Sequence, residues 1–143
     1  MNEILIDMLR NYGLSEIDGP LSNAEIMEFF HDIGFDWVTD DSTAWCSAAI
    51  NFFAKRHGYE RSGALDARSW LKVGEIVLEP QLGDIVVFWR GSYSDWRGHV
   101  GLYINHNEKY VWSLGGNVNN SISIAAYPRD RLLGYRRLSK IDG

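Results

Sequence analysis

The sequence is poor in the features that define several classes of protein. It has one cysteine among 143 residues, which excludes an intramolecular disulfide framework and a structural zinc site built from four thiolates. No apolar run approaches the roughly 18 residues that a transmembrane helix needs. The 14 Lys and Arg residues against 19 Asp and Glu give a formal net charge of -5, so the chain lacks the positive field that attracts nucleic acid. We therefore expect no nucleic-acid partner and no membrane insertion.

The first ten residues, MNEILIDMLR, also lack the pattern of a secretory signal. They are acidic and amphipathic, with no positively charged region, apolar region or cleavage site. We therefore expect synthesis in the cytoplasm, with any export by another route. The length predicts one domain spanning residues 1–143, and a chain that is 45% apolar can form a core.

Helical patterns fill the first half of the chain. Apolar residues at helical spacing predict a helix over residues 3–12 and a second one that begins at Ser22, where Ser22 and Glu25 form a capping box. A third helix is expected over residues 44–57, capped by Asp41, Ser42 or Thr43 and followed by Gly58. A short amphipathic helix is expected over residues 65–73.

The second half changes to strand patterns. Strands are expected over residues 84–89, 99–104, 109–114, 121–125 and 132–138, with a hairpin that joins the second and third of these. If the hairpin turn is centred between residues 106 and 107, His99 lies opposite Leu114. Helices followed by a mostly antiparallel meander predict an α+β fold. We divide it into N-terminal helices (1–40), the third and fourth helices (41–75) and an antiparallel sheet (80–140).

Cys46, the single thiol, falls in the first turn of the third expected helix. A free cysteine is most simply a small buried apolar residue. The helix N-terminus, however, favours a thiolate, which is the nucleophilic form, and the nearby Asp40 and Asp41 act against it. A nucleophilic Cys46 therefore needs a base.

His99 is the histidine that best fits the role of that base. His57 is about 16 Å from Cys46 along the same helix, His31 ends the second helix, and His106 lies in a turn. His99 begins a strand and faces the same side as Gly101, which leaves room for another group. An imidazole that only packs in the sheet is the alternative.

A catalytic imidazole also needs a group that fixes its tautomer. Asn117 is our candidate and Ser113 a weaker one, although an asparagine after two glycines is also typical of a turn.

Seven short stretches in order along the chain resemble the NlpC-type and CHAP papain-like cysteine hydrolases of peptidoglycan, in particular a phage endolysin-like branch. They are Ser15-Glu-Ile-Asp-Gly19, Ala44-Trp-Cys-Ser-Ala48, Ala67-Arg-Ser-Trp-Leu71, Gly83-Asp-Ile-Val-Val-Phe88, Gly98-His-Val-Gly-Leu-Tyr103, Gly115-Gly-Asn117 and Leu133-Gly-Tyr-Arg136. The resemblance implies a papain-like fold, with N-terminal helices packed on a sheet of about five to six strands. It implies Cys46 as the nucleophile and His99 as the base. Asn117 fits the CHAP version of the third residue, whereas the NlpC position for it holds Val111, Trp112 and Ser113.

The function that these residues predict is cleavage of a peptidoglycan amide bond through a thioester, as an endopeptidase. The alternatives are an N-acetylmuramoyl-L-alanine amidase, a catalytically silent wall-binding module, and acyl transfer from the cysteine to an amine. The enzyme would act on the cell wall, after holin-assisted release in a phage context or beside an immunity protein if it is a delivered toxin. No cofactor is expected.

Tryptophans and acidic residues suggest further binding groups. Trp45, Ser47, Trp96 and Trp112 are candidate substrate-binding residues, since aromatic side chains line grooves for sugars and peptides, although most tryptophans are core residues. Asp36, Asp40 and Asp41 precede Cys46, where some CHAP domains hold calcium. We expect a solvated loop or a helix cap there and no metal site.

Overall fold

The computed structural model describes residues 2–16, 23–32, 34–35, 45–118 and 120–141. Within these residues, α-helices come first along the chain and strands follow, which confirms the α+β class. The helices are α1 (Glu3–Arg10), α2 (Ala24–His31) and α3 (Cys46–Arg56), followed by the short 3-10 helix η1 (Ala67–Lys72). The strands are β1 (Glu75–Val77), β2 (Ile85–Trp89), β3 (Gly98–His106), β4 (Tyr110–Val118), β5 (Ser121–Pro128) and β6 (Leu132–Arg137), with the 3-10 turn η2 (Arg129–Arg131) before β6.

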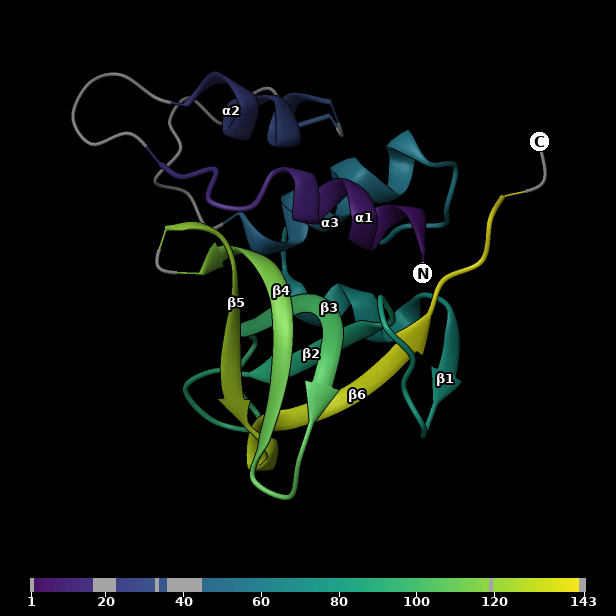
Figure 1. Ribbon diagram of the computed structural model, residues 1–143, viewed down its shortest axis with the longest axis vertical. Coiled ribbons are helices and arrows are strands. Elements are labelled where there is room, and N and C mark those ends of the chain that lie inside the picture. Colours follow the sequence, from purple (N-terminus) through teal and green to yellow (C-terminus); the bar gives the residue numbers. More distant parts are fainter. Residues whose placement is uncertain (1, 17–22, 33, 36–44, 119, 142–143) are drawn as a thin grey trace.

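The strands form one antiparallel sheet in the order β1-β6-β2-β3-β4-β5. Figure 1 shows the three α-helices gathered at one side of the sheet, with β4 and β5 side by side and β6 crossing behind them. The sheet is strongly curved. The evidence is that the ring of Tyr127 on β5 stacks on that of Phe88 on β2, with centroids 4.5 Å apart. Two strands lie between β2 and β5 in the sheet order, so a flat sheet would hold these rings much farther apart.

Asparagine side chains cap the first two helices. The side chain of Asn2 accepts a hydrogen bond from the N–H of Leu5 at the start of α1. At the start of α2, the side chain of Asn23 accepts from Glu25 and Ile26. The expected cap at Ser22 is therefore wrong by one residue, since asparagine caps a helix as well as serine does. Ser22 itself, like Asp41, Ser42 and Thr43, lies outside the described residues.

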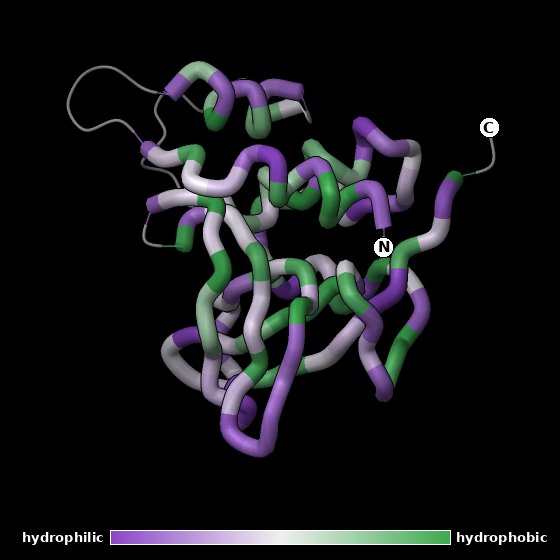
Figure 2. Tube along the Cα trace, viewed as in Figure 1, coloured by the Kyte–Doolittle hydropathy of each residue, from purple (hydrophilic) through white to green (hydrophobic). Residues whose placement is uncertain are grey.

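The helix α3 lies at the centre of the fold. Residues 46–54 of this helix are all buried, because it packs on α1 and α2 and on strands β3 and β4. The sheet face under α3 supplies Ile85, Val87, Val100, Leu102 and Leu114 to the main core. The opposite, concave face holds a second cluster of Val86, Phe88, Tyr103, Val111 and Tyr135. In Figure 2 apolar segments run along the strands, whereas the turn between β3 and β4 is hydrophilic.

The hairpin of β3 and β4 differs in register from the expectation. Leu102 pairs with Leu114, so His99 does not lie opposite Leu114. The turn is displaced because the side chain of Asn107 accepts hydrogen bonds from the N–H groups of Lys109 and Tyr110, which centres it two residues later. An irregularity between Tyr103 and Asn105 shifts the pairing again. β4 also extends through residues 115–118, beyond the expected end of this strand at residue 114.

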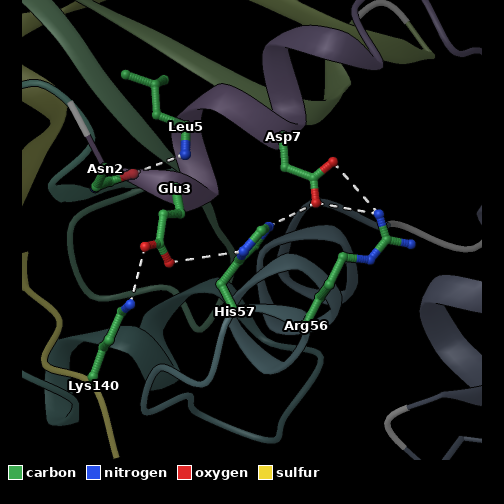
Figure 3. Close-up of polar contacts among 7 residues, drawn as sticks. All are labelled: Asn2, Glu3, Leu5, Asp7, Arg56, His57 and Lys140. Atoms are coloured by element: carbon green, nitrogen blue, oxygen red, sulfur yellow. Dashed lines mark hydrogen bonds and ion pairs between the residues drawn. The ribbon is translucent and has the colours of Figure 1, made fainter.

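Charged side chains join α1 to the end of α3 (Figure 3). The carboxylate of Asp7 accepts hydrogen bonds from Arg56 at 3.2 Å and from Nε2 of His57 at 2.8 Å. Lys140, near the end of the described chain, pairs with Glu3 at 2.9 Å. His57 therefore has the structural role expected for a residue at the C-terminus of α3. Within the described ranges, no helix has the length and apolarity that crossing a membrane requires.

Candidate functional site

Cys46 is the first residue of α3 and is 8% exposed. The backbone N–H of Val100 on β3 lies near enough to the sulfur to act on the pKa of the thiol. Val100 directly follows His99, so the structure brings the thiol to the strand segment that carries the candidate base. The pairing of β3 with β4 starts at Leu102 and Leu114. Val100 precedes it on β3, so the thiol contacts a part of β3 that is not paired with β4.

His99 lies on the concave face of the sheet and is 4% exposed. Its imidazole stacks on the ring of Tyr127, with centroids 4.9 Å apart and an interplanar angle of 20°. Tyr127 in turn stacks on Phe88, which pairs with His99 across β2 and β3. The plane of the imidazole is thus fixed by aromatic packing from β5. The sequence patterns gave no signal for Tyr127, because its contact with β3 depends on the curvature of the sheet.

The electrostatics of the site favour neutral groups. Burial raises the pKa of the Cys46 thiol, while the N–H groups of Val100 and Ser47 and the positive charge of Arg90 act in the opposite direction. Burial also lowers the pKa of His99 to about 3, and Arg90 contributes in the same direction. The helix N-terminus does favour the thiolate, as the sequence suggested, but desolvation is the larger effect. The resting pair is therefore a neutral thiol and a neutral imidazole.

Asn117 lies on β4 with a positive φ of 59°, at the irregularity between Gly115 and Val118. The residues that the structure describes provide no hydrogen-bond partner for Nε2 of His99. The expected hydrogen bond from His99 to Asn117 is therefore not formed at this nitrogen. Asn117 was expected just beyond the end of this strand, whereas β4 continues through residues 115–118 with an irregular pairing.

The two glycines before Asn117 allow close packing on both faces of β4. A Cβ atom on Gly115 would lie 2.9 Å from Nε2 of His99. A Cβ atom on Gly116 would lie 2.7 Å from two ring carbons of Trp45, the residue before Cys46. Glycines inside a strand often mark such close approaches. The two glycines are visible in the sequence, but the expected strand ended at residue 114, so they were not assigned to it.

Two of the candidate substrate-binding residues are buried structural residues. Trp45 is 0% exposed, and its Nε1 donates to Glu16 at 2.8 Å. Ser47 is also 0% exposed; its hydroxyl donates to the carbonyl of Ala64 at 2.6 Å and accepts from Nε1 of Trp70 at 2.9 Å. Neither side chain presents a surface to a substrate. The expectation for both is corrected, because α3 is buried on all sides in its first turns.

The other two candidates differ in their distance from the site. Trp96 is 74% exposed in the loop that leads into β3, three residues before His99. Trp112 is half-buried and pairs with Asn105, six residues along β3 from His99, or about 20 Å at 3.3 Å per residue. The expectation that Trp112 borders the site is therefore wrong, and it follows from the corrected register.

His57 bonds to Asp7 on α1, away from the site. Asp36, Asp40 and Asp41 lie outside the described residues. Among the residues that are described, no group of three or more His, Cys, Asp and Glu side chains could hold a metal ion. His106 contacts the hydroxyl of Tyr103 in the hairpin. The candidate site thus consists of Cys46, His99, Tyr127 and Arg90.

Comparison with known proteins identifies the fold. No family model and no curated protein sequence matches the chain. A crystal structure of a protein similar to a lipoprotein of the NLP/P60 family, from Staphylococcus aureus, matches with a TM-score of 0.54 and 20% identity. The match covers 94% of this chain and 40% of that protein, so the chain spans less than half the length of its structural neighbour. The α+β fold is therefore of the NLP/P60 type, which agrees with the NlpC part of the resemblance.

Proposed function

We propose that the chain is a cysteine hydrolase that cleaves an amide bond of peptidoglycan, with Cys46 as the nucleophile and His99 as the base. The observation that carries the proposal is the contact between the Cys46 sulfur and the N–H of Val100, beside His99. The thiol thus lies at a helix N-terminus, beside the residue that follows a buried histidine on β3, and this supports a cysteine nucleophile with an adjacent base. The fold shared with an NLP/P60-family protein supports the choice of a cell-wall substrate.

In the proposed reaction, His99 takes the proton of the Cys46 thiol, and the thiolate attacks the carbonyl carbon of the amide. A C–S bond forms, the C–N bond breaks, and the imidazolium returns the proton to the leaving amine. Water then hydrolyses the thioester and releases the acid and the free thiol. The N–H groups of Val100 and Ser47 lower the pKa of the thiol, and backbone donors in this position also stabilise negative charge that develops on a carbonyl oxygen.

The experiment that tests this function is digestion of purified cell walls. We expect wild-type protein to solubilise them, and Cys46→Ala and His99→Gln to reduce the rate by at least about a hundredfold, with unchanged circular dichroism. His106→Gln, which alters a histidine in the hairpin, is the matched control and should retain activity. Solubilisation by Cys46→Ala at the wild-type rate would refute the nucleophile. Mass spectrometry of the fragments distinguishes an endopeptidase, which leaves peptide on the glycan, from an amidase, which frees whole stems.

A catalytically silent wall-binding module is the second candidate function. The observation that favours it is the burial of both groups, which raises the pKa of Cys46 and lowers that of His99 and so opposes formation of the ion pair. A thiol-directed label such as iodoacetamide discriminates between the two functions. An enzyme should be alkylated at Cys46 faster in the wild type than in His99→Gln, whereas a silent module should show equal, slow rates in both.

A further inference from the structure

The concave face of the sheet contains buried polar atoms that have no hydrogen-bond partner within the described part of the chain. They are Nε2 of His99, Oγ of Ser113 and the hydroxyl of Tyr135. The exposed fractions of His99 and Ser113 are 4% and 0%. Buried polar groups are almost always satisfied by protein or by ordered water, since leaving one unsatisfied costs stability. Nε2 of His99 on β3 and Oγ of Ser113 on β4 lie on neighbouring strands, so one hydrogen-bonding group could satisfy both.

His99 and Ser113 approach each other across a pair of glycines. Leu102 pairs with Leu114 and Tyr103 with Ser113, which makes Gly101 and Gly115 the next cross-strand neighbours. A Cβ atom on Gly115 would lie 2.9 Å from Nε2 of His99, and one on Gly101 would lie 2.5 Å from Oγ of Ser113. The two side chains thus lean from opposite strands over the same two residues. Paired Cβ positions in an antiparallel ladder are only about 4.5–5.5 Å apart, so the two polar atoms approach each other from the two strands over this pair.

We propose that Ser113, through one buried water molecule, is the positioning residue that holds Nε2 of His99. This inference rests on the proposed function and adds that Nδ1 takes the proton of Cys46, which requires the ring proton on Nε2. The water accepts the Nε2–H and donates its own two protons to Oγ of Ser113 and to a backbone carbonyl oxygen, so it has none left to donate to Nε2. Two backbone carbonyl oxygens lie near the same glycines: that of Val100 is 3.3 Å from the Cβ position on Gly115, and that of Leu114 is 2.8 Å from the Cβ position on Gly101. They can complete the set of about three hydrogen bonds that a buried water typically makes.

Ser113 then takes the part that the sequence assigned to Asn117. Tyr127 fixes the plane of the imidazole by stacking, but an aromatic face does not determine which nitrogen carries the proton. A hydrogen-bond acceptor at Nε2 does determine it. The division of roles is therefore between Tyr127, which sets the ring plane, and Ser113, which sets the tautomer.

The test uses ¹⁵N signals of the His99 imidazole in Cys46→Ala protein, because protonated and unprotonated ring nitrogens give separate resonances. We expect a single tautomer with the proton on Nε2. Adding Ser113→Ala should produce a mixture of tautomers, whereas adding Ser123→Ala should leave the signals unchanged, since the Ser123 hydroxyl donates to Val118. Unchanged signals in the Ser113→Ala protein would overturn the proposal, as would a tautomer shift produced by Asn117→Ala alone.

Kinetics and crystallography provide further readouts. With Cys46 intact, Ser113→Ala should lower kcat about three- to tenfold with KM unchanged, the effect of losing one neutral hydrogen bond. A crystal structure should show a water within about 2.7–3.2 Å of both Nε2 and Oγ, and apolar packing between them would contradict the proposal. The NMR result does not depend on activity. If Cys46→Ala still digests cell walls, the proposed function fails; if only the tautomer test fails, the role of Ser113 alone is lost.

Discussion

The imidazole of His99 on β3 stacks on the ring of Tyr127 on β5, at 4.9 Å between centroids. Tyr127→Phe keeps this stack and should leave activity on cell walls near that of the wild type. Tyr127→Ala removes it, and we expect kcat to fall together with a loss of about 1–3 kcal/mol in the free energy of unfolding, since Tyr127 is only half-buried. Cell-wall digestion and urea unfolding of both variants test this. Full activity in Tyr127→Ala would show that the stack does not position His99.

Substitution of Gly115 or Gly116 by alanine should have different effects, because the two residues face opposite sides of β4. Gly115→Ala places a methyl group 2.9 Å from Nε2 of His99, and Gly116→Ala places one 2.7 Å from the ring of Trp45. Overpacking of this kind costs about 1–3 kcal/mol. We expect Gly115→Ala to act mainly on activity, because the imidazole must shift, and Gly116→Ala mainly on stability, because Trp45 is fully buried. Rate and urea midpoint are measured on each, and an opposite ranking would contradict the assignment of the faces.

The stability of the protein should depend on pH through His99. Burial, with Arg90, lowers its pKa to about 3, whereas a histidine in the unfolded chain has a pKa of about 6.5. Between these values the unfolded state binds more protons, so the free energy of unfolding rises with pH, by up to about 1.4 kcal/mol per pH unit. This contribution is complete above pH 6.5 and is lost as the pH falls toward 3. Urea titrations should show a weaker acid dependence for His99→Gln than for wild type, and an unchanged one for His106→Gln.

The ion pair of Asp84 and Arg137 should stabilise the start of β2. Asp84 is 4% exposed and accepts hydrogen bonds from Arg137 at 3.0 and 2.8 Å and from the N–H of Gln81 at 2.7 Å. Arg137→Ala leaves a buried carboxylate with fewer partners, and we expect a loss of about 1–3 kcal/mol. Arg136→Ala is the comparison, because the Arg136 side chain donates to the backbone carbonyls of Leu71 and Tyr135. Equal losses in urea unfolding would show that the buried charge is not the cause.

Local patterns predicted the elements that carry the candidate site. Hydrophobic periodicity predicts the helix that begins near Cys46, the strand that begins near His99 and the α+β order. The apolar positions that form this pattern are those that pack where α3 meets β3 and β4. The approach of Cys46 to the strand segment that carries His99 could be inferred, because a helix packed on a sheet brings its first turn to one strand. The capping of α2 was displaced by one residue, since Ser22 and Asn23 are both good caps.

Features that depend on register and curvature could not be predicted. The side chain of Asn107 sets the hairpin turn, and its effect propagates to every pair of β3 and β4. In this register Trp112 pairs with Asn105, away from His99, and Gly115 and Gly116 lie within β4, beyond the strand end expected at residue 114. The contact of Tyr127 with His99 requires β5 to curve back toward β2, and no local pattern encodes this curvature.

The stack of Phe88, Tyr127 and His99 also bears on how fast the imidazole can rotate. A half-turn of the ring about its Cβ–Cγ bond would exchange the positions of its nitrogens, and the ring has Tyr127 against one face and the backbone of Gly115 at its edge. Such a turn would sweep the edge of the ring through the space that Tyr127 and Gly115 occupy, so we expect it to be slower than for a solvated imidazole.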